Sequence, residues 1–396
     1  MRVIVISLIT PYKENVRGTS ALAYHLLKGR SDDIDVVLYT FNGNKLSDKQ
    51  INYVARDLNL EVRKLDLPRW YRWMFRYHLL FLRIFLKFPF VYYITLQNKV
   101  VEEIKSMKPN LVWVNNEEMS RIVKQFANLC RIQLGPDVES FYYYRMMSRR
   151  FVMNNNFDFW KCAIMYRKYA RLERNLCTDD NFTYYAVGEK DIEHMSQLSP
   201  NVNCKFLRHP HYEIKDVCEI HFHQPKIKLL IAGRYDLYMQ QSADELIQHL
   251  SSHSFELKDD FVITFLGKGW ENHVSTLQQS EYDVQHIQFA PDYIDEVIKH
   301  DIQLTPICIG TGTKGKVLDA LANGLLVLGT PYALENIAVE HGKSCVQWKH
   351  ANEVPDILFD IANNREKYEQ MARKGRNSVL CEHNPAIISQ RFFSIK

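Results

Sequence analysis

The sequence lacks the features that mark several classes of protein. None of its eight cysteines forms a C-x-x-C pair or another metal-ligand spacing, so we expect reduced thiols and no disulfide framework. It has no internal repeat, and 15 glycines and 13 prolines in 396 residues exclude a collagen-like or disordered chain. The N-terminus opens on a charged, strand-like run and not on a cleavable signal, so we expect a cytoplasmic protein.

The chain, at 396 residues, is too long for one ordinary hydrophobic core, and two domains of roughly 150–200 residues are expected. Short apolar, β-branched runs alternate with longer segments of helical period, which is typical of parallel sheets built from βαβ units. The expected strands cover residues 3–7, 35–40, 61–65, 111–115, 131–134 and 184–187 in the first half, and residues 228–232, 261–266, 286–289, 302–306, 325–329 and 345–348 in the second.

A boundary is indicated at residues 200–224, which are punctuated by Pro and Asn and have no periodicity. We therefore predict an α/β protein with two doubly wound, Rossmann-like domains, residues 1–205 and 206–380. A C-terminal helix in residues 381–396 is expected to pack back on the first domain. Ligands of such domains bind at the carboxyl ends of the strands, which we expect to face each other across a cleft.

The net charge of +4 hides an asymmetry between the two halves. Residues 1–200 carry a formal charge of +9, whereas residues 201–396 carry −5. An acidic second half without any recognisable nucleic-acid motif argues against nucleic acid as a partner.

One run in the second half, LTPICIGTGTKGKVLDALANGLLVLGT at residues 304–330, carries the clearest chemistry. It predicts a strand, a Gly/Thr turn, a helix and a second strand. Glycines let backbone N–H groups approach a phosphate, the helix N-terminus adds partial positive charge, and Lys314 adds a full charge. The run therefore predicts a diphosphate site. A tight turn whose glycines serve geometry alone is the alternative, since the run fits neither a P-loop nor the G-x-G-x-x-G pattern.

Residues 310–337 resemble the donor-site signature of family-four GT-B glycosyltransferases, which are retaining, metal-independent enzymes that use nucleotide sugars. The signature reads G-S/T-G-T-K/R-x-K-x-L-E-A-M-A-x-G-x-P-V-V and continues into a G-L-E-G loop. Weaker similarities are Gly233-Arg234 after a strand, the run at residues 186–191, and an Asp-x-Glu-Ser run at residues 137–140. The resemblance implies the GT-B fold, with the donor bound by the second domain.

The resemblance also implies roles for individual residues. Arg234 and Lys314 would contact the pyrophosphate, and Asp319 would accept hydrogen bonds from the ribose; these three form the predicted catalytic set. Further donor-binding residues would be Gly18, Gly233, Gly310, Gly312, Thr313 and Glu335. On the acceptor side the resemblance implies Asp137, Glu139 and Arg145.

Three departures from the family pattern concern the sugar and the phosphates. A second Glu, two helical turns before position 319, is replaced by Thr311. Position 319 is Asp instead of Glu, which shortens its reach by one methylene. The Lys that usually follows Gly-Arg by about a turn is missing, and its neighbourhood holds Tyr238, Met239 and Gln240. These departures leave the identity of the sugar open.

Two segments of the first half are rich in aromatic and basic residues. Residues 69–93 hold eleven aromatics, five Lys and Arg and no acid, and residues 141–174 hold ten aromatics and eight Lys and Arg. On one helix, Arg72, Arg76 and Arg83 would share a narrow stripe. The helix is then either a core helix with a solvated stripe or an interfacial helix with its arginines toward anionic lipid. Five charges exclude a transmembrane span.

With the resemblance, the sequence predicts a retaining glycosyltransferase that moves a hexosyl or related sugar from a UDP- or GDP-sugar to a glycan or lipid-linked glycan. Surface polysaccharide synthesis at the inner face of the cytoplasmic membrane is the expected setting. Such a transfer needs no cofactor and no Ser-His-Asp set. We predict no metal site, because Asp33-x-Asp35 precedes a strand and His209-Pro210-His211 has no third ligand. Two alternatives stay open, a non-catalytic partner of the same fold and a nucleotide-sugar epimerase.

Overall fold

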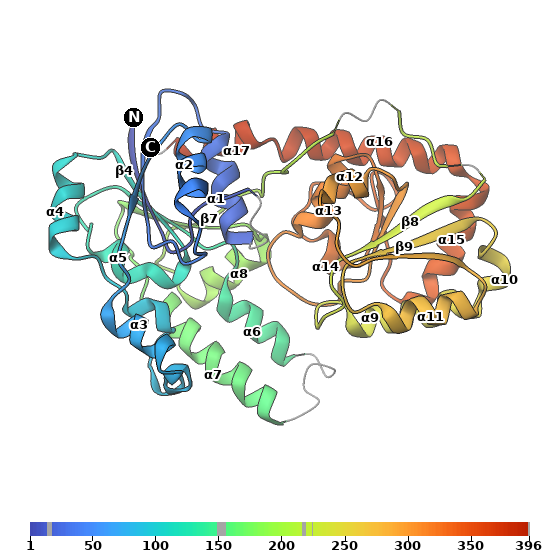
Figure 1. Cartoon of the computed structure of the whole chain (residues 1–396), viewed down its shortest axis with the longest axis horizontal. Helices are drawn as coiled ribbons and strands as arrows, with labels where there is room; N and C mark the ends of the chain where they lie inside the picture. Colours follow the sequence, from blue (N-terminus) through green and yellow to red (C-terminus); the bar gives the residue numbers. More distant parts are fainter. Residues whose placement is uncertain (14–17, 149–155, 216–218, 224, 395–396) are drawn as a thin grey trace. The chain divides into compact units, whose positions relative to one another are not determined.

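The computed structural model describes residues 1–13, 18–148, 156–215, 219–223 and 225–394 (Figure 1). The chain divides into two units, of which the first comprises Met1–Pro210 with Pro385–Lys396 and the second comprises His211–Asn384. The sequence boundaries at 205/206 and 380/381 lie a few residues before these divisions. Each unit is described by itself.

The first unit is built on a seven-stranded sheet with all strands parallel, in the order β3-β2-β1-β4-β5-β6-β7. Its strands are β1 (Arg2–Ser7), β2 (Asp35–Thr40), β3 (Glu61–Lys64), β4 (Leu111–Asn115), β5 (Arg131–Leu134), β6 (Phe182–Ala186) and β7 (Cys204–Phe206). Its helices are α1 (Gly18–Lys28), α2 (Asp48–Asp57), α3 (Arg69–Arg76), α4 (Asn98–Ser106), α5 (Ser120–Lys124), α6 (Glu139–Met147), α7 (Asn156–Glu173), α8 (Glu189–Leu198) and α17 (Pro385–Phe393), with 3-10 turns η1 (Leu79–Phe85), η2 (Phe90–Tyr93) and η3 (Glu117–Met119).

Both faces of this sheet are buried, which explains the continuous apolar runs in its strands. On β1, Val3 and Val5 join the apolar cluster on one face, whereas Ile4 and Ile6 join the cluster on the other. The last helix of the chain, α17, covers the first of these faces, where the ring of Phe392 lies 4.8 Å from that of the fully buried Trp113.

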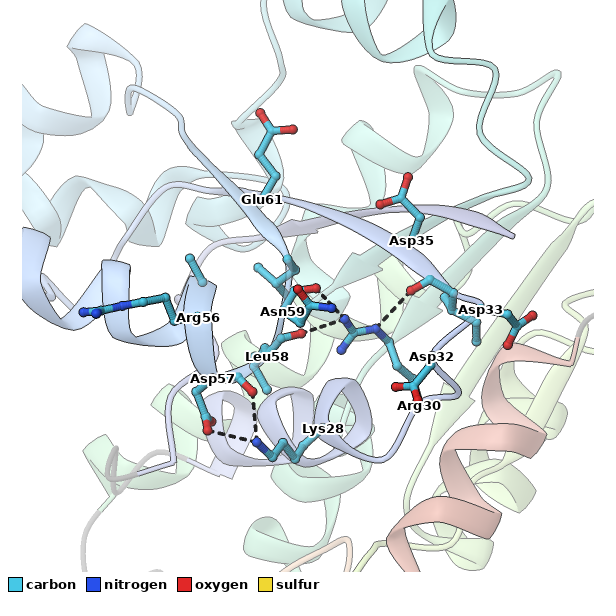
Figure 2. A pocket seen from close by; sticks show the side chains of 13 residues that line it. Lys28, Arg30, Asp32, Asp33, Asp35, Arg56, Asp57, Leu58, Asn59 and Glu61 are labelled. Carbon is cyan, nitrogen blue, oxygen red and sulfur yellow. Dashed lines mark hydrogen bonds and ion pairs between the residues drawn. The ribbon is translucent and has the colours of Figure 1, made fainter.

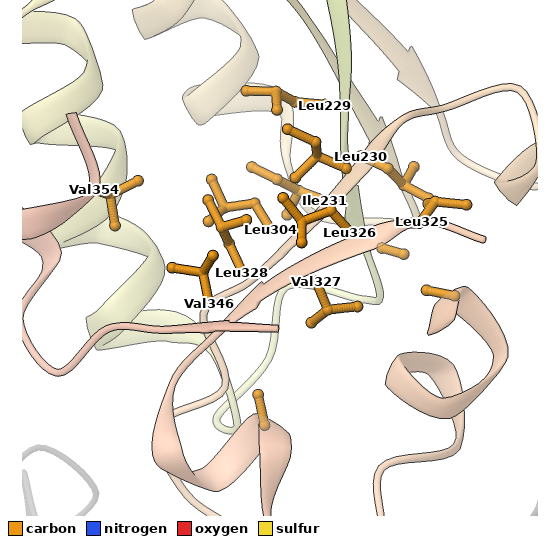
Figure 3. Close-up of a cluster of buried hydrophobic side chains, with 14 of the residues drawn as sticks. Leu229, Leu230, Ile231, Leu304, Leu325, Leu326, Val327, Leu328, Val346 and Val354 are labelled. Atoms are coloured by element: carbon orange, nitrogen blue, oxygen red, sulfur yellow. The ribbon is translucent and has the colours of Figure 1, made fainter. Parts of the chain in front are cut away.

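The second unit is built on a six-stranded parallel sheet in the order β10-β9-β8-β11-β12-β13. Its strands are β8 (Ile227–Ala232), β9 (Phe261–Leu266), β10 (Asp283–Ile287), β11 (Ile302–Thr305), β12 (Leu326–Gly329) and β13 (Val346–Gln347). Its helices are α9 (Gln240–Ser252), α10 (Ser254–Leu257), α11 (Glu271–Gln279), α12 (Tyr293–Val297), α13 (Gly315–Ala322), α14 (Pro331–Leu334), α15 (Val354–Asn363) and α16 (Arg365–Glu382). In its core, Leu304, Leu328 and Val346 meet from three neighbouring strands (Figure 3).

The predicted fold class, two Rossmann-like α/β domains with parallel sheets, is confirmed, but two strand predictions need correction. The short edge strand β7 lies inside the segment that we interpreted as a boundary. Strand β10 begins at Asp283 and ends at Ile287, so the prediction of residues 286–289 is displaced. Phe289, the last residue of the predicted strand, is 76% exposed.

The prediction of one helix that starts at residue 69 and is closed by Pro89 is wrong. Helix α3 ends at Arg76, His78 has a left-handed φ of 53°, and 3-10 turns follow. Arg83 therefore lies beyond the helix end, and the continuous stripe with Arg72 and Arg76 does not form. The core-helix interpretation is also wrong, because α3 has no buried residue.

Candidate functional site

The strand order of the second unit reverses between β8 and β11, and ligands of open parallel sheets bind at the carboxyl ends of such strands. Strand β8 runs into Gly233-Arg234, and β11 runs into the turn at residues 306–314. The two loops touch, since the backbone N–H of Cys308 donates to the Tyr238 carbonyl at 2.8 Å. The structure thus brings together the loops of two segments that the sequence singled out.

The first of these loops is fixed by backbone contacts at Gly233. This glycine has a φ of 137°, and its carbonyl accepts a hydrogen bond from Nε1 of the buried Trp270 at 2.7 Å. Gly267 packs so closely that a Cβ there would lie 2.2 Å from the Gly233 oxygen. A rigid turn therefore carries Arg234, whose side chain is exposed to solvent.

The second loop turns at two glycines in conformations that other residues rarely adopt, Gly310 with φ 134° and Gly312 with φ 62°. The ammonium of Lys314 donates to the carbonyl oxygens of Thr311 at 2.6 Å and Gly312 at 3.0 Å. Its charge therefore lies on the turn itself, directly before the N-terminus of α13. Thr313 is partly exposed between these residues.

Asn336 and Lys316 are two residues of this region to which sequence reasoning assigned no role. Asn336 Nδ2 donates to the Gly312 carbonyl at 3.0 Å and so ties the loop after α14 to the glycine turn. The ammonium of Lys316 reaches the other loop, where it lies 3.6 Å from the point that a Cβ of Gly233 would occupy. The second basic residue of the Lys-x-Lys pair was the available signal for Lys316.

Asp319, on α13, is buried, and its Oδ1 has no hydrogen-bond partner among the residues that the structure describes. Burial raises the pKa of this carboxyl to about 7, an effect that Lys316 partly opposes. Glu335 is half-buried in the loop after α14, next to Asn336. These two predicted donor residues therefore differ in access to solvent.

The first unit reverses its strand order between β1 and β4, and carboxylates gather at that edge. Glu117 follows β4, Glu139 follows β5, and Glu173 ends α7. Burial and the neighbouring carboxyls raise the pKa of Glu117 well above its usual range and that of Glu139 to about 8. Glu173 interacts with Glu117 in the interior, and its charge adds to the burial that raises the pKa of Glu117.

Among the predicted acceptor-side residues, Asp137 and Glu139 belong to this carboxylate cluster and are partly exposed. Arg145 lies nearly two turns after Glu139 along α6, with its guanidinium 4.1 Å from the centre of the Phe141 ring. Sequence reasoning missed Glu117 and Glu173. The run Asn-Glu-Glu directly after a strand was a usable signal for Glu117, whereas nothing local marks Glu173.

Comparison with known proteins decides the class of this fold. Residues 242–394 match a family model described as glycosyl transferase-like, and no curated protein matches the chain. HepE from Anabaena, in complex with UDP, is similar with a TM-score of 0.63 and 12% identity over 99% of this chain and 98% of that chain. The chain has the GT-B fold.

Two further solved structures share the GT-B fold over nearly their full length. Sucrose-phosphate synthase from Thermosynechococcus elongatus is similar with a TM-score of 0.63 and 10% identity over 99% of this chain and 97% of that chain. WaaG, a glycosyltransferase involved in lipopolysaccharide biosynthesis, is similar with a TM-score of 0.59 and 13% identity over 100% of both chains.

Figure 2 shows a pocket of about 950 Å³ in the first unit of this GT-B protein. It lies at the amino end of the strands, opposite to the end where Glu117 and Glu139 follow β4 and β5. It is lined by the first residues of β2 and β3, Asp35 and Glu61. The Arg30 guanidinium in it donates to the backbone carbonyls of Leu58 and Asn59. Arg30 thus satisfies backbone carbonyls directly after the end of α2. We assign this pocket no ligand.

Gly18 and the His209-Pro210-His211 run are the remaining sequence candidates. Gly18 begins α1, and residues 14–17 before it are not described. His209 is buried, which lowers its pKa to about 4, and its Nδ1 contacts the Pro210 carbonyl. Within the described ranges, no three His, Cys, Asp or Glu side chains are grouped to hold a metal ion.

Proposed function

We propose that this protein is a retaining glycosyltransferase that uses a nucleoside diphosphate sugar. The observation that carries the proposal is the meeting of the Gly233-Arg234 turn and the Gly310–Lys314 turn at the switch point of the second unit. Backbone N–H groups, a helix N-terminus and two cations suit a diphosphate, both when the donor binds and when the diphosphate leaves. The HepE structures contain UDP or UDP-glucose, so UDP is the first nucleotide to test.

Asp319 and Glu335 would serve the nucleoside and the sugar in this proposal. A carboxyl that changes protonation near neutral pH both donates and accepts hydrogen bonds, as vicinal hydroxyls require. The free Oδ1 of Asp319 among the described residues supports this role.

For the acceptor, we propose a glycan or lipid-linked glycan held at the carboxylate edge of the first unit. Asp137 and Glu139 present oxygens that accept hydrogen bonds from sugar hydroxyls. Aromatic rings flank them, and burial and the charge of Glu139 raise the pKa of the Tyr143 hydroxyl. Such a combination of carboxylates and rings is suited to a polyhydroxylated ligand.

We further propose that α3 and η1 rest on an anionic membrane at its cytoplasmic face. Their rings point outward, with Trp73 60%, Phe81 65% and Phe85 82% exposed. Arg72, Arg76 and Arg83 are exposed among them, and residues 69–93 contain no acid. Rings that enter headgroups and cations that face anionic lipid fit this composition. No helix within the described ranges has the length and apolarity of a membrane span.

The proposed membrane surface adjoins the proposed acceptor edge within the same unit. Lys168 on α7 donates to the Arg83 carbonyl in η1, and the next residue, Tyr169, donates its hydroxyl to Glu118 beside the carboxylate cluster. A lipid-linked acceptor that enters from the membrane would therefore reach the carboxylates over a short path.

The donor proposal is tested by calorimetric titration with UDP and GDP. Replacing either cation, in Arg234→Ala or Lys314→Ala, should weaken binding of the diphosphate by roughly tenfold or more, because hydrogen bonds to charged groups are worth about 1.5–3 kcal/mol. Lys343→Ala, which removes an exposed lysine paired with Glu340, is the matched control. Unchanged nucleotide binding in both cation variants would refute the assignment.

The membrane proposal is tested by co-sedimentation with vesicles of phosphatidylcholine, with and without phosphatidylglycerol. The wild type should pellet only with the anionic vesicles. Reversal of three charges in Arg72→Glu, Arg76→Glu and Arg83→Glu should weaken binding at least a hundredfold, at about 1 kcal/mol per charge. Phe255→Ser with Phe289→Ser removes two exposed rings of the second unit as a control. Equal pelleting of the reversed variant would rule the membrane surface out.

A further inference from the structure

Lys316 follows the Gly310–Lys314 turn in the chain, but its side chain reaches the Gly233-Arg234 turn of the same unit. It is the second residue of α13, yet its ammonium lies 3.6 Å from the Cβ position of Gly233, at the end of β8. The ring centre of Tyr293 lies 5.8 Å from the same ammonium. The side chain thus extends away from its own helix toward the loop that carries Arg234.

Apart from its contact with the Tyr293 ring, the ammonium of Lys316 makes no hydrogen bond, and no ion pair within 4.0 Å, with any residue in the described ranges. Burial by the surrounding chain lowers its pKa, and Asp236 and Asp319 only partly oppose that effect. The residue is nevertheless exposed to solvent. A cation that is surrounded by protein, unpaired and still accessible has the properties of an anion-binding group.

The nearby acids do not neutralise Lys316. Asp236 Oδ1 accepts the backbone N–H of Tyr238 at 3.0 Å and so shapes the start of the following segment. The charges of both Lys316 and Arg234 lower the pKa of Asp236, although its burial raises it more. Arg234 and Lys316 are therefore both within electrostatic reach of the same turn.

The resemblance to family-four enzymes leaves a gap at this place. The Lys expected about a turn after Gly-Arg is missing, and Met239 lies there instead. Its methyl group is 2.4 Å from the Cβ position of Gly233, closer than the Lys316 ammonium at 3.6 Å. The apolar Met239 and the cation from α13 thus occupy adjacent places beside the glycine.

We propose that Lys316 binds the donor diphosphate together with Arg234. The proposal rests on the proposed function. Lys314 differs from Lys316 in that its ammonium also donates to the carbonyls of Thr311 and Gly312 and so keeps the turn in shape.

The test is calorimetric titration with UDP and with UMP, which carries one phosphate fewer. Lys316→Met keeps the length of the side chain and removes the charge, and should weaken UDP binding about ten- to a hundredfold, with a smaller loss for UMP. Lys316→Arg restores the charge, and its affinity for UDP should lie within about fivefold of that of the wild type. A small loss of affinity is expected because the N–H groups of Arg are arranged differently from those of Lys. Lys343→Met is the matched control.

The possible results separate the two proposals. If the wild type binds UDP and Lys316→Met binds it with the same affinity, the role of Lys316 is overturned and the proposed donor site stands. A wild type that binds neither UDP nor GDP would overturn both proposals. If Lys316→Met unfolds at a lower temperature without nucleotide, Lys316→Arg decides: affinity restored by Arg supports the proposal, and affinity lost as in Met contradicts it.

Discussion

The two units place opposite chemistry on the same architectural feature. At the switch point of the second unit, backbone turns at Gly233 and Gly310 carry cations. At that of the first unit, the buried side chains of Glu117 and Glu173 and the partly exposed Glu139 make an edge of carboxylates with raised pKa values. Both sheets are parallel and doubly wound, so topology fixes where a ligand binds and the loops fix which ligand.

The two edges also differ in what builds them. The cationic edge depends on glycine conformations and on contacts between backbone atoms. The acidic edge depends on the burial of ionisable side chains. Replacement of a single glycine should therefore damage the cationic edge most. Changes of pH or of side-chain charge should instead change the stability of the acidic edge.

The largest effect is expected from Gly267→Ala in the second unit. Its Cβ would lie 2.2 Å from the Gly233 oxygen, at a φ of 140°, so the phosphate turn must shift. We expect a loss of roughly 3 kcal/mol or more in the free energy of unfolding and no measurable UDP binding. Gly342→Ala is the control, because it has a φ of 77° with open space around the Cβ and should cost only about 1–2 kcal/mol. Equal effects of the two substitutions would contradict a backbone-built site.

An intermediate effect is expected from Glu117→Gln in the first unit. Carboxyls with raised native pKa values bind more protons in the folded state than in the unfolded state. The free energy of unfolding should therefore fall as the pH rises from about 4 through about 8, the pKa of Glu139. Removing one such group should flatten the decline by up to about 1.4 kcal/mol per pH unit.

Urea unfolding of both proteins at pH 5 and pH 8 measures this difference. Glu102→Gln, at an exposed glutamate paired with Lys105 on α4, should follow the wild-type profile. A wild type that grows more stable between pH 5 and pH 8, with Glu117→Gln parallel to it, would remove the contrast between the two edges.

The smallest effect is expected from Asn336→Ala, which removes a side-chain anchor from the backbone-built edge. The lost hydrogen bond to the Gly312 carbonyl should cost about 1 kcal/mol in stability. UDP binding should weaken only severalfold. Asn363→Ala loses a comparable bond to the Phe359 carbonyl on the surface of α15 and should leave UDP binding unchanged. A loss as large as that of Gly267→Ala would show that side chains build this edge as well.

Much of the fold was predictable because most of its strands are continuous apolar runs in the sequence. The bounds of β2, β4 and β9 are those that the apolar runs predict. Strand β7 was missed because three residues on a sheet edge leave no period. The prediction for residues 69–93 failed because the helical spacing of the sequence continues past His78, where the backbone turns. Rings of this segment, such as Tyr71 and Phe90, stack on each other instead of lining one helix.

The candidate site divides in the same way. The glycine turn and Lys314 are consecutive in the chain, so a motif predicts them. The contact of Glu117 with Glu173 and the reach of Lys316 to Gly233 join distant segments. Such pairings depend on the packing of whole elements, which a single sequence does not specify. The roles of the predicted donor residues themselves stay predictions.

The position of α17 has a consequence for synthesis on the ribosome. The first unit emerges first, but Trp113 in its core is covered by Phe392, near the end of the chain. The second unit, His211–Asn384, is complete before that helix leaves the exit tunnel. Of the two units, the one that is translated first is therefore the last to close its core, and it must stay soluble until α17 has emerged.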